Sequence, residues 1–158
     1  RRQRQMCIRD SISPLGFILG DEGSGAVLGK LLVGDVLKNQ LPPAIKEAFL
    51  KQFDLTAPEI IDRVYRQPFP NRFLASLSPF LAQHLEEPAI RSLVLNSFIA
   101  FLRRNVMQYD YKQYPVHFIG SVAHCYKEIL QEAAQTTGIQ IGKILQSPME
   151  GLIQYHQQ

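Results

Sequence analysis

The chain has 158 residues, a formal net charge of +3 and 46% hydrophobic residues, enough for one domain with an ordinary core. Residues 1–10 hold four arginines and one aspartate, so the rest of the sequence has 13 basic and 13 acidic side chains. A neutral body gives no electrostatic support for nucleic-acid binding. Because no apolar run approaches the roughly 20 residues of a membrane-spanning helix, we expect a cytoplasmic protein with neither nucleic acid nor membrane as a partner.

Residues 1–10 show no helical or alternating hydrophobic pattern. We therefore expect a non-native or disordered arm there and a domain over residues 11–158. The alternative is a short basic arm that contacts phosphates, although it lacks the aromatic side chains typical of such arms.

A glycine-rich acidic turn, Leu-Gly-Asp-Glu-Gly-Ser-Gly at residues 19–25, follows a short expected strand at residues 16–19. So much glycine at a helix entrance indicates unusual backbone angles or a close approach to the backbone. Asp21 and Glu22 could hold hydroxyls, amines or a cation there. The alternative for Asp21 is a side chain that only stabilises its own turn.

The turn leads into an expected helix that Ser24 can cap and that carries apolar residues at helical spacing up to Leu37. Gly29 and Gly34 lie inside this helix, where each costs about 1 kcal/mol relative to alanine. We predict that another backbone packs closely against them; loose local packing is the alternative.

Residues 41–87 are expected to be helical and divided by prolines. Thr56 and Glu59 flank an early proline and predict a capping box, and Pro79 predicts a kink or break. The longest helix is expected to begin at Pro88, with a broad apolar stripe.

The last part of the chain predicts a βαβα unit. Val116–Ile119 is a short β-prone run that we expect to form a strand. The Gly120-Ser121 turn leads into an expected helix that Gly138 ends. Residues 139–145 alternate as a second strand, and a final helix is expected from Ser147. A right-handed crossover predicts two neighbouring parallel strands. Ligands bind at such strand ends in open α/β sheets, although a single Gly-Ser turn is a weak signal.

The acidic turn and the following Ala-Val-Leu-Gly at residues 26–29 resemble the N-acetylglucosamine kinase and BadF/BadG/BcrA/BcrD-type ATPase family, within the actin-like, sugar kinase and heat-shock ATPase superfamily. Phe-Ile-Gly-Ser-Val-Ala at residues 118–123 is similar to the adenosine motif of that superfamily. Pro148 and Gly151 match its final Pro-x-x-Gly helix start. The resemblance extends from about residue 12 to the C-terminus.

The resemblance implies the C-terminal domain of an actin-like (RNase H-like) ATPase fold, helix-rich α/β with a small, mostly parallel sheet. It implies an ATP-dependent sugar kinase that uses ATP and Mg²⁺, acts on N-acetylglucosamine or another amino sugar, and could form a homodimer. Asp21 would bind sugar hydroxyls, Gly20 and Gly23 would shape the turn with support from Glu22, and Gly120 and Ser121 would face the nucleoside.

The sequence departs from the family in three places. Pro14-Leu15-Gly16 stands where many members have an aromatic residue between glycines, and Ser121 replaces the second glycine of the adenosine motif. The phosphate loop and the catalytic aspartate of the family belong to an N-terminal domain that is not in this sequence. We therefore expect no catalytic residue in this chain and no activity from it alone; a nucleotide-sensing or partner-binding module without phosphotransfer is the alternative.

Overall fold

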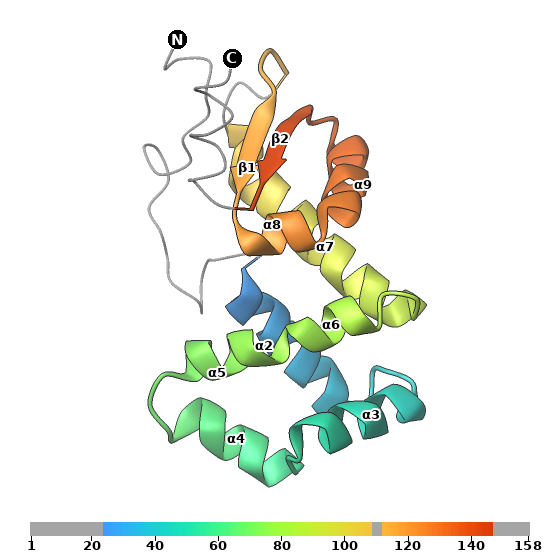
Figure 1. The fold of residues 1–158 in the computed structure, drawn as a ribbon, viewed down its shortest axis with the longest axis vertical. Coiled ribbons are helices and arrows are strands. Elements are labelled where there is room, and N and C mark those ends of the chain that lie inside the picture. The colour runs from blue at the N-terminus through green and yellow to red at the C-terminus, as the bar shows by residue number, and fades with distance from the viewer. Residues whose placement is uncertain (1–23, 109–111, 147–158) are drawn as a thin grey trace. The chain divides into compact units, whose positions relative to one another are not determined.

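The structure, a computed structural model, describes residues 24–108 and 112–146 (Figure 1). These residues form two compact units, the described parts of 15–94 and of 95–158, and the boundary lies within helix α7 (Pro88–Arg104). The expected helix-rich composition with a small parallel sheet is confirmed. No helix in these two ranges is both long and apolar enough to cross a membrane. The strand expected at residues 16–19 and the helix expected from Ser147 lie outside the described residues.

The first unit is helical throughout, and its helices begin where the sequence predicts. Ser24 caps α2 (Gly25–Leu37), because its Oγ accepts the N–H of Val27 at 3.2 Å. The capping box of Thr56 and Glu59 is present at the start of α4 (Ala57–Tyr65). The remaining elements of the unit are α3 (Pro43–Phe53), α4 (Ala57–Tyr65), α5 (Pro70–Leu77), α6 (Pro79–Gln83) and the start of α7. The break expected at Pro79 separates α5 from α6 and is confirmed.

Helix α5 lies against both α2 and α4 (Figure 1). The closest approach is at Gly29 of α2, where an added Cβ would lie 2.6 Å from the carbonyl carbon of Leu74 and still nearer to its oxygen. The predicted backbone contact at Gly29 is therefore confirmed. At Gly34 the prediction was wrong, because no atom of the described residues outside its own helix turn lies within 4 Å of a Cβ added there.

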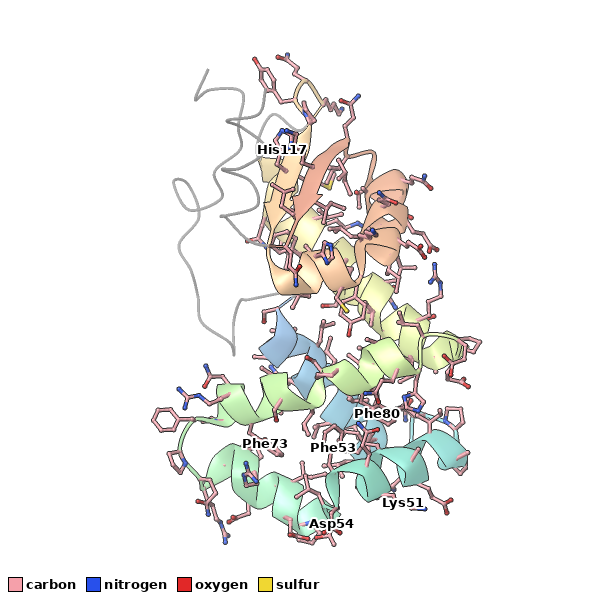
Figure 2. The ribbon with its side chains drawn as sticks, in the orientation of Figure 1. Lys51, Phe53, Asp54, Phe73, Phe80 and His117 are labelled. Atoms are coloured by element: carbon pink, nitrogen blue, oxygen red, sulfur yellow. The ribbon has the colours of Figure 1, made fainter. Side chains whose placement is uncertain are left out.

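An aromatic cluster fills the space between α3 and α6 in the first unit (Figure 2). The ring of Phe49 meets that of Phe80 edge to face with centroids 5.4 Å apart, and Phe53 lies 5.1 Å from Phe49. His84 stacks on Phe80 at 4.0 Å while its Nδ1 lies 2.9 Å from the Phe80 carbonyl oxygen. Phe49 and Phe80 are fully buried, so this cluster is the aromatic part of the unit's core.

The second unit contains the expected β-α-β crossover. The end of α7 and the 3₁₀ turn η3 (Val106–Gln108) precede β1 (Val116–Ile119), α8 (Ser121–Cys125), α9 (Lys127–Thr137) and β2 (Ile141–Leu145). The two strands pair in parallel, as predicted, with Val116 opposite Ile141 and Ile119 opposite Leu145. Gly138 ends α9 in the left-handed conformation, also as predicted.

The helix between the two strands is divided at Tyr126, where the sequence predicts one continuous helix. Tyr126 has φ −110° and ψ 32°, outside the helical region, and its ring is buried with its centroid 6.1 Å from that of Phe98 on α7. Burial of this large ring gives a tertiary reason for the break, which helical spacing alone does not reveal.

The two glycines of α2 give opposite expectations for stability. Gly29→Ala places a methyl group against the Leu74 carbonyl, so we expect a loss of about 1–3 kcal/mol in the free energy of unfolding. Gly34→Ala meets open space and should raise it by about 0.5–1 kcal/mol, because alanine loses less backbone entropy in a helix. Urea unfolding of both variants measures the difference; equal shifts would contradict the close contact.

Candidate nucleotide-binding turn

The predicted acidic turn lies outside the described residues, so the structure does not place Gly20, Asp21, Glu22 or Gly23. The first described residue after it is Ser24, the N-cap of α2. The predicted role of the four residues in sugar binding therefore stays a prediction. The other predicted turn, at Gly120 and Ser121, connects β1 to α8 and lies within the described residues, apart from the side chain of Ser121.

Gly120 adopts a backbone conformation that requires glycine. Its φ is 149° and its ψ is 159°, a combination that residues with a Cβ essentially do not adopt. Apart from its chain neighbours, no atom of the described residues lies within 4 Å of the position that a Cβ would occupy. The side of Gly120 that lacks a side chain therefore faces open space, which allows a ligand to approach the backbone closely.

Both polar backbone groups of Gly120 are used within the unit. Its N–H donates to the carbonyl of Leu145 on β2 at 2.9 Å, and its carbonyl accepts the N–H of His124 at 3.1 Å. The first bond continues the β1–β2 ladder into the turn, and the second begins α8. A ligand at this turn would therefore meet the Cα face of Gly120, and the turn is held in place by the sheet.

A β-bulge lies in the same pair of strands. Between the pairs Val116–Ile141 and Phe118–Ile144, β2 contains one extra residue, so that two of its residues face His117. The imidazole Nδ1 of His117 accepts the N–H of Lys143 at 2.8 Å, as a strand carbonyl would. This bond requires the tautomer with the proton on Nε2.

Gly142 makes this arrangement possible. A Cβ at Gly142 would overlap the His117 ring, with the Nε2 atom 3.1 Å away and other ring atoms closer. Our sequence analysis missed the bulge, although a glycine inside a strand is a recognised sign of one. The bulge sets the register that brings the Leu145 carbonyl to Gly120.

The pKa of Asp35 on α2 is raised, because burial disfavours the charged carboxylate and nearby Lys38 only partly offsets this effect. A perturbed pKa can mark a functional site. Asp35 lies ten residues beyond the start of α2, about 15 Å along the helix axis. Its perturbed pKa therefore does not mark the acidic turn.

In residues 24–108 and 112–146, no three histidine, cysteine, aspartate or glutamate side chains come together in a way that could hold a metal ion.

Comparison with solved structures finds a protein of Porphyromonas gingivalis named "Putative N-acetylglucosamine Kinase". It is 60% identical to this chain over 92% of the chain's length, with a TM-score of 0.87. The resemblance to the N-acetylglucosamine kinase family is confirmed. The chain spans about half of that protein, covering 51% of its length. No family model matches the chain, and no curated protein matches it.

The backbone geometry of Gly120 predicts a graded loss of stability. Gly120 and Gly138 both have positive φ and both face open space, so neither alanine variant collides with another atom. Gly138 has φ 78° and ψ 18°, close to the left-handed region, where alanine costs about 1–2 kcal/mol. Gly120→Ala should cost at least as much and up to about 3 kcal/mol, because its conformation is almost exclusive to glycine.

Thermal unfolding of the two glycine variants measures this order. A Gly120→Ala protein as stable as the wild type would show that the turn adopts another conformation.

The pKa of Asp35 predicts a pH-dependent gain from Asp35→Asn. A carboxyl whose pKa is higher in the folded than in the unfolded protein stabilises the fold below its unfolded pKa, and this stability is lost as the pH rises through the folded pKa. Asparagine removes the partly buried charge, so the variant should unfold at a slightly higher temperature than the wild type at pH 7. The difference should shrink as the pH falls towards about 4. A pH-independent difference would contradict the raised pKa of the partly buried carboxyl.

Proposed function

We propose that this chain is the C-terminal half of an ATP-dependent sugar kinase that phosphorylates N-acetylglucosamine or another amino sugar in the cytoplasm. The observation that carries the proposal is 60% identity, over 92% of the chain, to the P. gingivalis protein named "Putative N-acetylglucosamine Kinase". Residues 11–158 would form the C-terminal domain of an actin-like ATPase fold, and the parallel β1–β2 pair with its crossover helices supports this assignment.

The acidic turn would bind the sugar. Asp21 would accept hydrogen bonds from two neighbouring hydroxyls, for which a carboxylate with two oxygens is suited. Gly20 and Gly23 would allow the turn its backbone angles, and Glu22 would support it. Ser24, the first described residue after the turn, supports this assignment. Its side chain caps α2 and so fixes the start of the helix directly after the turn.

Gly120 and Ser121 would bind the adenine nucleoside of ATP. The open face of Gly120 and its glycine-only backbone support this role, since a side chain there would occupy the space in front of the turn. Helix α8 has only five residues, so its dipole contributes little. Binding of the nucleoside would therefore depend on the open space at Gly120. The hydrogen bond from the Gly120 N–H to the Leu145 carbonyl holds the backbone in place there.

The remaining parts of the site would come from the half of the kinase that this chain does not span. A carboxylate there would take the proton of the sugar hydroxyl while the hydroxyl oxygen attacks the γ-phosphorus and the bond to the bridging oxygen of ADP breaks. Mg²⁺, when bound with ATP, would neutralise charge on the phosphate oxygens. This chain would bind and orient both reactants, which brings the reacting atoms together and excludes water.

The test uses the full-length protein that carries this sequence. ADP release should require both ATP and N-acetylglucosamine, and Asp21→Ala should lower kcat/KM for the sugar by about 100-fold or more, because two hydrogen bonds to a charged group are lost. Glu86→Ala is the matched control. Glu86 is an exposed carboxylate of the first unit, and its removal should leave kcat/KM within about twofold of the wild-type value.

Two results would contradict the proposal. Equal activity of the wild type and Asp21→Ala would exclude the acidic turn as the sugar site. ATP binding without any sugar-dependent turnover would favour the alternative, a nucleotide-binding module that senses or recruits a partner.

A further inference from the structure

The side chain of His117 on β1 has no role in the proposed function, although it is held in a defined position (Figure 2). Its Nδ1 accepts the N–H of Lys143 on β2 at 2.8 Å. A Cβ on Gly142 would overlap the imidazole, so the ring lies against the backbone of β2. Because the side chain is exposed, burial in the core does not account for this position.

The apolar pattern of β2 accounts for the bulge opposite this histidine. Ile141 lies opposite Val116. Three residues later, Ile144 lies opposite Phe118, only two residues further along β1. Residues three apart in a regular strand point to opposite faces, whereas the bulge places both isoleucines on one face. A regular ladder would instead place Lys143 opposite Phe118, on the face that packs against α7. The apolar side chains of β2 therefore specify the bulge.

The bulge leaves one backbone N–H of β2 without a partner in the ladder. At the start of the ladder, the Val116 N–H donates to the Gln140 carbonyl at 2.8 Å. At its end, the Gly120 N–H donates to the Leu145 carbonyl at 2.9 Å. Between these two bonds the chain advances four residues in β1 but five in β2, so one residue of β2 is extra. The imidazole of His117 accepts the N–H that this extra residue leaves over.

We propose that His117 is a positioning residue for nucleotide binding. By accepting the N–H of Lys143, it holds β2 at the place where the Leu145 carbonyl binds the Gly120 turn. Lys143 is only two residues before Leu145, so a movement of its peptide group displaces the carbonyl that fixes the turn. Hydrogen bonds that orient the groups behind a binding site can control affinity without touching the ligand. The inference rests on the proposed role of Gly120 in binding the nucleoside.

Two substitutions of nearly equal shape test the hydrogen bond in the full-length protein. Asparagine places an oxygen acceptor where histidine has Nδ1, whereas leucine has the same branching and no acceptor. His117→Leu should raise KM for ATP about five- to tenfold, the factor that one hydrogen bond contributes. It should leave kcat and KM for N-acetylglucosamine within about twofold of the wild-type values. His117→Asn should keep KM for ATP close to that of the wild type, although asparagine is disfavoured in strands.

Hydrogen exchange tests the positioning in the absence of nucleotide. An amide exchanges faster when its local structure opens more often. The Gly120 N–H should therefore exchange about five- to tenfold faster in His117→Leu than in the wild type, and His117→Asn should retain slow exchange. Circular dichroism and thermal unfolding confirm that each variant is folded.

Lys143→Leu is the matched control. It places the same apolar side chain at an exposed position that faces His117, but it keeps the backbone N–H that the imidazole accepts. Exchange at Gly120 and KM for ATP should both stay within about twofold of the wild-type values.

Three results would overturn the inference while the proposed function stands: a wild-type KM for ATP in His117→Leu, unchanged exchange at Gly120 in that variant, or a His117→Asn protein as impaired as His117→Leu. A wild type that neither binds nor turns over ATP would overturn the proposed function itself, and His117 would then have no nucleotide to position.

Discussion

In the second unit, one hydrogen bond ties the turn after β1 to the sheet: the N–H of Gly120 donates to the carbonyl of Leu145 at 2.9 Å. It extends the parallel ladder by one residue and fixes a backbone conformation that only glycine adopts readily. The register that makes this bond possible includes the bulge opposite His117, whose imidazole takes up the N–H of Lys143. The turn that we propose binds the nucleoside is therefore held by the sheet and has open space at its Cα.

A comparable constraint organises the first unit. The Leu74 carbonyl of α5 approaches α2 so closely at Gly29 that a side chain has no room. This contact fixes the helix whose capped start at Ser24 directly follows the acidic turn. In the first unit Gly29 allows the close contact with Leu74, and in the second unit Gly142 leaves room for the His117 ring. Each of these contacts involves an element next to a proposed binding turn.

Local signals in the sequence predicted much of this fold. Ser24 and Thr56 marked helix starts, Pro79 a break and Gly138 a helix end, because each acts on its own backbone. The break at Tyr126 and the open space at Gly34 were not predicted, because each depends on how distant parts of the chain pack. The bulge at Gly142 was missed although a glycine inside a strand is a local sign of one. The proposed binding roles of the two turns came from the resemblance to a family. A Gly-Ser turn by itself is a common connection and does not predict a binding site.

A crystal structure of the full-length protein with N-acetylglucosamine and a non-hydrolysable ATP analogue tests the central claim most directly, that this chain supplies both a sugar-binding and a nucleoside-binding turn. We expect the sugar hydroxyls within hydrogen-bonding distance of the Asp21 carboxylate and the nucleoside in van der Waals contact with the Cα of Gly120. A nucleotide bound elsewhere, or an Asp21 side chain turned into its own loop and away from the sugar, would contradict the account.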